Sequence, residues 1–213
     1  MTTSAPSVLI LNGSPHPNGC TATALRELEN TLHDNGIVTE FIQLGRENVH
    51  GCIACGSCGK TGRCVFDDIV NQLAPKFEHA DGLVVGSPVY YGSPNATLLA
   101  VLDRLFYSTA FDKTMKVGAS VVSCRRSGNT ASFDVLNKYF TISNMPVVSS
   151  QYWNNIHGFR AEDALKDLEG LQTMRTLGRN MAFLLKSIQY GRTEFGLPEK
   201  ETDHAFTSFP DGL

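Results

Sequence analysis

The chain has 213 residues, of which 42% are hydrophobic and 18% charged, a composition typical of one folded globular domain and unlike that of disordered or fibrous proteins. Its 18 basic and 21 acidic side chains give a net charge of −3, which argues against nucleic acid or an anionic membrane as the main partner. The unusual feature is six cysteines, of which four lie within thirteen residues: Cys52, Cys55, Cys58 and Cys64.

No secretory signal or membrane span is predicted. The N-terminal residues lack the basic region of a signal peptide. The uncharged run 82–102 is interrupted by glycines, prolines and an asparagine, which indicates strand, turn and helix instead of a membrane helix. We therefore expect a cytoplasmic protein with reduced thiols, in which clustered cysteines indicate metal or redox chemistry.

Apolar runs and helical periodicity alternate along the chain. Strands are predicted at 7–12, 38–44, 82–85 and 117–123, and a fifth beginning at 146–149. Helical spacing of apolar residues follows each of them, at Leu25–Leu32, Ile69–Leu73, Leu98–Phe106, Phe133–Phe140 and Leu165–Ile188. Asp67 and Asp68 are expected to cap the second helix, because carboxylates suit a helix N-terminus.

This alternation predicts an α/β fold with a doubly wound five-stranded parallel sheet. We assign residues 1–190 to one domain, with a cysteine-rich loop at 51–65, and residues 191–213 to a C-terminal arm. The arm has no place in the minimal fold and is expected to pack on a neighbouring subunit of a homodimer or homotetramer, through Phe195, Phe206 and Phe209. Ligands of such sheets bind beyond the carboxyl ends of the strands, where the strand order reverses.

The loop after the first strand, 13–21 (GSPHPNGCT), leads directly into a helix. It is neither a Walker A loop nor a GxGxxG loop. It offers hydroxyls, an amide and free N–H groups at the positive end of a helix, which predicts a phosphate site without Lys or Arg. An ordinary strand–helix turn is the alternative. The candidate ligand-binding residues are Ser14, His16, Asn18, Gly19, Cys20 and Thr21.

The loop GSPHPNGCTATAL resembles the FMN phosphate loop of the flavodoxin-like NADPH-dependent FMN reductase and iron-sulfur flavoprotein families. Three later loops are similar to the flavin loops of these families, in the expected order: GSPVYYGSPNATLLAVLDRL, SCRRSGNTASFDVL and SSQYWNNIHG. The resemblance spans most of residues 7–160. The chain departs from it with Cys20 in place of the usual Asn, and with His16 where a basic residue is common. It implies the flavodoxin-like strand order 2-1-3-4-5, with FMN at the switch point.

Further flavin contacts are expected from the third and fourth loops. The segment PVYYG combines fixed backbone, two aromatic side chains and a glycine, and could lie along the isoalloxazine edge; its residues are Pro88, Val89, Tyr90, Tyr91 and Gly92. Arg125 or Arg126 would stabilise negative charge near N1–C2=O or meet a pyridine-nucleotide phosphate, beside Ser123 and Gly128. Alternatively the tyrosines are ordinary surface or core aromatics, and the arginines a solvated pair. Trp153 is expected to pack on the fifth strand; the alternative is that it covers the flavin site.

The four clustered cysteines have the spacing C-x2-C-x2-C-x5-C. Three thiolates two residues apart can surround one cluster, which the fourth then closes. Structural zinc uses two more widely separated pairs of ligands, so this spacing suits zinc less well. The resemblance implies a [4Fe–4S] cluster on Cys52, Cys55, Cys58 and Cys64, as in iron-sulfur flavoproteins. Free or redox-active thiols, as in cluster-free relatives with a similar tail, and zinc stay open as alternatives.

These features predict an FMN-dependent NAD(P)H oxidoreductase that transfers hydride from a nicotinamide to FMN and on to a quinone, a flavin or another small acceptor. No protein acid or base is assigned, because the cofactor carries the chemistry. The alternative is an electron-transfer flavoprotein of the iron-sulfur type, with a [4Fe–4S] cluster and FMN, acting between protein partners.

Overall fold

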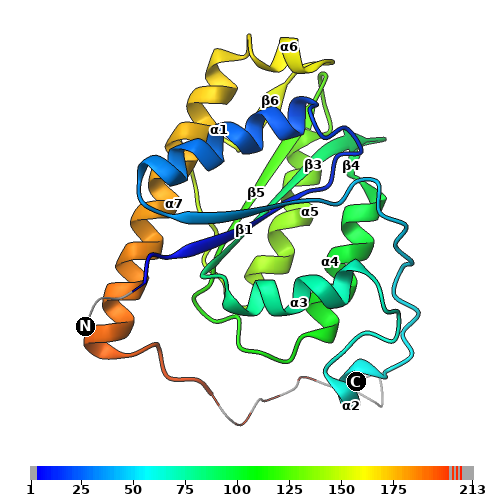
Figure 1. The fold of residues 1–213 in the computed structure, drawn as a ribbon, viewed down its shortest axis with the longest axis vertical. Coiled ribbons are helices and arrows are strands. Elements are labelled where there is room, and N and C mark those ends of the chain that lie inside the picture. Colours follow the sequence, from blue (N-terminus) through cyan, green and yellow to red (C-terminus); the bar gives the residue numbers. More distant parts are fainter. Residues whose placement is uncertain (1–3, 202, 204, 206, 208–213) are drawn as a thin grey trace.

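A computed structural model describes residues 4–201, 203, 205 and 207 (Figure 1). The strands are β1 (Ser7–Asn12), β2 (Val38–Gln43), β3 (Gly82–Tyr90), β4 (Ser93–Pro94), β5 (Val117–Cys124) and β6 (Asn155–His157). The helices are α1 (Cys20–Asp34), α2 (Cys58–Thr61), α3 (Ile69–His79), α4 (Ala96–Ser108), α5 (Asn129–Thr141), α6 (Ala161–Ala164) and α7 (Leu168–Phe195).

Five strands form a parallel sheet in the order β2-β1-β3-β5-β6, and the short β4 pairs antiparallel with the end of β3. With this hairpin strand set aside, the order is the predicted 2-1-3-4-5, so the flavodoxin-like fold class is confirmed. The central strands are buried at nearly every position. Their continuous apolar sequences arise because helices cover both faces of the sheet.

Helices α1 and α7 cover one face of the sheet, and α3, α4 and α5 cover the other (Figure 1). The leucines of α1 pack with the methionines and leucines of α7, as the helical spacing predicts. Gly178 lets these two helices approach closely, since a Cβ there would lie 2.7 Å from Cβ of Thr31. The result is a three-layer arrangement whose strand ends are free to build a site.

The fifth strand lies later in the chain than predicted, and the predicted start pairs with β5 only briefly. Pro146–Ser149 forms one isolated bridge, between Val147 and Gly118, and the strand itself is β6. Gly118 bonds to the carbonyl of Pro146 and to the N–H of Val148, each at 2.9 Å, but the polar, aromatic stretch that follows leaves the sheet before the chain returns to it. Trp153 lies in this excursion and is 52% exposed, so the expectation that it packs on the strand is wrong.

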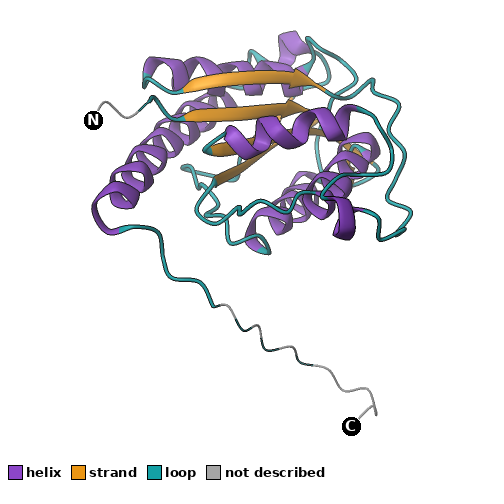
Figure 2. Cartoon of the chain, turned by 60° about the horizontal axis from the view of Figure 1, so that its bottom comes forward, coloured by secondary structure: helices purple, strands orange, loops and turns teal. Residues whose placement is uncertain are grey.

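The last helical segment differs from the prediction at both ends. It begins at Leu168 and not at Leu165, because the side chain of Asp167 accepts from the N–H of Gly170 and caps the helix there. The short helix α6 lies just before the predicted segment. Helix α7 continues through Phe195, past the predicted boundary at residue 190. The chain then leads away from the sheet and helices (Figure 2).

The predicted subunit contact of the C-terminal arm stays a prediction. Phe195 is 81% exposed, and Phe206 and Phe209 lie outside the described residues. Lys200 of the arm pairs with Asp112 of the same chain. Among the helices described, none is long and apolar enough to cross a membrane.

Candidate functional site

A cavity of about 870 Å³ opens at the carboxyl ends of β1, β3 and β5. This is the position expected for a ligand of a doubly wound sheet, and the volume lies in the range of cofactor sites. Most of the predicted ligand-binding residues line it: Ser14, His16, Asn18, Gly19, Cys20, Thr21, Pro88, Val89, Tyr90, Ser123 and Arg125. Sequence reasoning missed Pro17, Cys124 and the wall after β6, which consists of Gly158, Phe159, Arg160, Ala161 and Glu162.

One wall of the cavity is the N-terminus of α1. The helix is capped by Gly19, whose carbonyl accepts from the N–H of Thr23 at 2.9 Å. The N–H groups of the first turn, on Cys20, Thr21 and Ala22, therefore have no acceptor within the helix. No acidic side chain occupies this turn. Three N–H groups without a partner in the helix, at the positive end of a 15-residue helix, are the arrangement that favours an anion.

Two side chains that sequence reasoning missed hold the first loop in place. Asn12 is fully buried at the end of β1; its Oδ1 accepts from the N–H of Ser14 at 3.1 Å, and its Nδ2 donates to Gln43 at 2.7 Å. Gln43 in turn donates to the carbonyl of Ser14 at 2.5 Å. A polar residue at the end of an apolar strand was the available signal. The ends of β1 and β2 thus hold the loop in place, in addition to the bonds from the N–H of His16 to the Ser14 hydroxyl and from the N–H of Gly19 to the His16 carbonyl.

Hydrogen bonds join the other walls to this loop. The buried hydroxyls of Thr21 and Ser123 lie 2.7 Å apart and connect α1 with β5. The Cys20 thiol donates to the carbonyl of Arg160 at 3.1 Å. Burial raises the pKa of this thiol, and the negative charge of Asp163 adds to the effect. Cys20 is therefore a neutral structural contact at neutral pH.

Three predicted residues lie beside the cavity and do not line it. Tyr91 (φ +50°) and Gly92 (φ +79°) form the two-residue turn between β3 and β4, and both are in the left-handed region. Two positive φ angles in succession are typical of a type I′ hairpin turn. Gly128 packs against this turn, since a Cβ there would lie 2.9 Å from Cα of Gly92. The Tyr91 side chain is fully exposed.

Tyr91→Asn is expected to raise the free energy of unfolding by about 1 kcal/mol, because Asn tolerates the left-handed conformation better than Tyr. Urea unfolding followed by circular dichroism measures the change. Tyr190→Asn, at an exposed position of α7, is the control and should give no gain. A less stable Tyr91→Asn protein would show that the tyrosine makes a stabilising contact.

The four clustered cysteines line a second cavity, of about 500 Å³, between the cysteine-rich loop and α4. All four are free thiols, and Cys52 and Cys55 are exposed. Hydrogen bonds from the side chain and backbone of Ser57 lower the pKa of the Cys55 thiol. In the part of the chain that the structure describes, no three Cys, His, Asp or Glu side chains are close enough to share a single metal ion.

Arg104, on α4, is a buried cation facing this second cavity, and sequence reasoning missed it. Its side chain is 1% exposed. Its Nη1 and Nη2 donate to Asp68 at 2.7 and 2.9 Å, and its Nε lies 3.2 Å from Sγ of Cys64. Asp68 also caps α3, as predicted, by accepting from the N–H of Val70. The available signal was its position three residues after Val101, on the apolar side of the helix.

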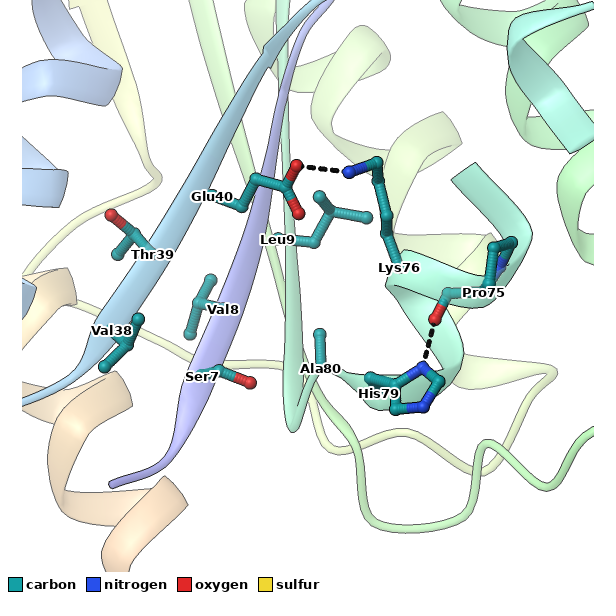
Figure 3. Close-up of a pocket in the computed structure, with 10 residues that line it drawn as sticks. All are labelled: Ser7, Val8, Leu9, Val38, Thr39, Glu40, Pro75, Lys76, His79 and Ala80. Carbon is teal, nitrogen blue, oxygen red and sulfur yellow. Dashed lines mark hydrogen bonds and ion pairs between the residues drawn. The ribbon is translucent and has the colours of Figure 1, made fainter. Parts of the chain in front are cut away.

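A third cavity, of about 400 Å³, lies between the amino-terminal halves of β1 and β2 and helix α3 (Figure 3). The ion pair of Lys76 with Glu40 crosses it at 2.5 Å, and His79 contacts the carbonyl of Pro75. Both charged side chains of the pair are solvent-exposed, so the pair contributes little to stability. We assign no ligand to this cavity.

In doubly wound sheets, nucleotides and flavins bind at the switch point of the strand order, and the first cavity lies there in this chain. The chain matches the model of the NADPH-dependent FMN reductase family over residues 6–160, and it belongs to this family. It is therefore a flavoprotein of a family of flavin-dependent oxidoreductases.

Curated relatives and solved structures agree with this assignment. The chain is 34% identical over 190 residues to an iron-sulfur flavoprotein of Methanocaldococcus jannaschii, covering 85% of this chain and 98% of the relative. It is 29% identical over 186 residues to an iron-sulfur flavoprotein of Methanosarcina thermophila, covering 85% and 96%. A flavodoxin from the domain Archaea is similar with a TM-score of 0.59 at 15% identity, covering 84% of this chain and 99% of that one, a likeness that shows the fold.

Proposed function

We propose that the protein is an FMN-dependent NAD(P)H oxidoreductase that passes electrons to a quinone, a flavin or another small acceptor. The observation that carries the proposal is the cavity at the strand ends. It joins the N-terminus of α1 to an open space lined by the end of β3 and by the aromatic side chains of Tyr90 and Phe159. This combination matches a cofactor with a phosphate at one end and a flat ring at the other.

The residues of the cavity fit FMN. The free N–H groups at the start of α1, with the Ser14 hydroxyl and the Asn18 amide, would hold the phosphate. The end of β3, from Pro88 to Tyr90, would lie along the ring, with Tyr91, Gly92 and Gly128 shaping the hairpin behind it. Arg125 is exposed at the rim, where its charge can meet reduced flavin or a nucleotide phosphate.

FMN, when bound, supplies hydride and electron transfer between a nicotinamide and the acceptor. The part of this chain is to bind the phosphate, to orient the ring with the β3 backbone and to hold a positive charge at the rim. No side chain of the cavity is assigned as an acid or a base. NAD(P)H is the proposed co-substrate.

Anaerobic stopped-flow mixing of the FMN-loaded protein with NADPH or NADH tests the proposal. We expect the flavin absorbance to bleach with at least one nucleotide. Arg125→Ala should slow bleaching by about tenfold or more, as expected for loss of a charge-assisted hydrogen bond worth about 1.5–3 kcal/mol. Arg126→Ala is the control, since this exposed neighbour does not line the cavity. A flavin that dithionite bleaches but neither nucleotide reduces would overturn the oxidoreductase proposal.

A second candidate function is electron transfer between protein partners, with a [4Fe–4S] cluster beside the FMN. The two relatives described above are iron-sulfur flavoproteins. The four thiols line one cavity, and no three of them are close enough to bind a single metal ion. That arrangement suits a cage of several iron atoms, each bound by one thiolate, better than a single zinc ion held at about 2.3 Å from every sulfur. Cys52, Cys55, Cys58 and Cys64 would be its ligands.

A further inference from the structure

Arg104 has an unusual environment for a charged side chain. It is almost completely inaccessible to solvent, on the inner face of a helix that otherwise packs leucines and valines against the sheet. A lone buried cation is costly, so its retention requires partners that offset its charge. The side chain has five N–H donors to satisfy.

Its hydrogen-bond partners lie just before the cysteine-rich loop, at the end of the loop and just after it. Besides Asp68 and Cys64, the guanidinium donates to the carbonyls of His50 and Phe66, each at 3.2 Å. The ring of Phe66 lies beneath it, 5.0 Å from the guanidinium carbon. The guanidinium thus ties both ends of the loop to α4.

The carboxylate of Asp68 accepts hydrogen bonds from only two of the three guanidinium nitrogens of Arg104. Its two oxygens take Nη1 and Nη2, while Nε is left to point at the sulfur of Cys64. The three other cysteines line the same cavity. A cluster held by four thiolates is anionic, and hydrogen bonds to its sulfurs and nearby positive charge stabilise the more reduced state.

We propose that Arg104 is a positioning residue of the four-cysteine site, which holds Cys64 in place for a cluster and raises the cluster's reduction potential through its Nε–H bond to the sulfur. The inference rests on the second candidate function, because it requires a cluster in this site. It assigns a role to a residue outside the cysteine motif.

Arg104→Gln tests the inference in the full-length chain, purified and reconstituted anaerobically with iron and sulfide. Three quantities are measured: FMN per chain, iron per chain and the cluster's reduction potential by redox titration with electron paramagnetic resonance. We expect FMN to be unchanged, and either a more negative potential or a loss of iron. Arg63→Gln removes the same charge from an exposed neighbour of Cys64 and should leave all three near the wild-type values.

A normal iron content together with an unchanged potential in Arg104→Gln would overturn the role of Arg104. If Arg104→Gln binds no FMN because it fails to fold, the same three quantities are measured on Arg104→Lys. It keeps the charge but loses the Nε donor, and the potential must still fall or iron must be lost. A wild-type chain that binds FMN but no iron would overturn the cluster itself, and this inference with it, while leaving the FMN-dependent function untouched.

Discussion

Gly45→Ala is expected to weaken FMN binding by about tenfold or more and to lower the stability of the protein by about 1–3 kcal/mol. A Cβ at this position would lie 2.0 Å from the carbonyl carbon of Ser14 and 2.3 Å from the nitrogen of Pro15. Both are backbone atoms, so no side chain can rotate to make room. The loop itself must move, and the Ser14 hydroxyl and the bonds from Asn12 and Gln43 move with it.

Fluorescence titration of the apoprotein with FMN measures the affinity, and urea unfolding measures the stability. Gly51→Ala is the matched control, because a Cβ there meets nothing within 4 Å and the residue has ordinary backbone angles. The control should bind FMN as the wild type does. A Gly45→Ala protein with wild-type affinity would show that the phosphate is held elsewhere.

Asp68→Ala is expected to lower the free energy of unfolding by about 3–5 kcal/mol, because it leaves the buried guanidinium of Arg104 without its carboxylate. It also removes the cap of α3, which is worth about 1 kcal/mol. We expect few other single substitutions in this chain to lower the free energy of unfolding by as much. Urea unfolding followed by circular dichroism gives the value.

The neighbouring residue supplies the control for this experiment. Asp67 forms an ion pair with Arg63, but both side chains are exposed, so Asp67→Ala should cost less than about 1 kcal/mol. The double variant Asp68→Leu with Arg104→Met should recover much of the loss, since it replaces both buried charges by apolar groups. An Asp68→Ala protein as stable as Asp67→Ala would mean that water already reaches the guanidinium.

Sequence reasoning predicted the fold well because continuous apolar strands and leucine-spaced helices are local signals. It failed for the fifth strand. The segment around Val147 has a residue composition typical of a strand, but the free edge of β5 pairs mainly with residues 155–157. Edge-strand pairing depends on which segment reaches the edge, and no local pattern encodes that. The same holds for Trp153, whose exposure follows from the path of the chain and not from its side chain.

The site was predictable only in part, for a related reason. The phosphate loop is a contiguous motif, and the structure brings its residues together with Ser123 and Arg125. Asn12, Gln43 and Gly45 support that loop from the ends of two strands, and their role exists only once the strands are paired. Arg104 likewise meets Cys64 across 40 positions of sequence. The sequence separation between such supporting residues and their partners follows no pattern, so the sequence alone does not reveal them.

Helix α4 has one end at each of the two candidate redox sites. It begins beside the hairpin of the first cavity, where Asn95 caps it and donates its own N–H to Ser87 at 2.8 Å. Arg104 follows nine residues later, so a rise of about 1.5 Å per residue places it about 14 Å along the helix axis. An FMN in the first cavity and a cluster in the second would be held a fixed length apart by a rigid, packed element. The separation of the two groups would then be a property of the fold, since neither would have to move to reach the other.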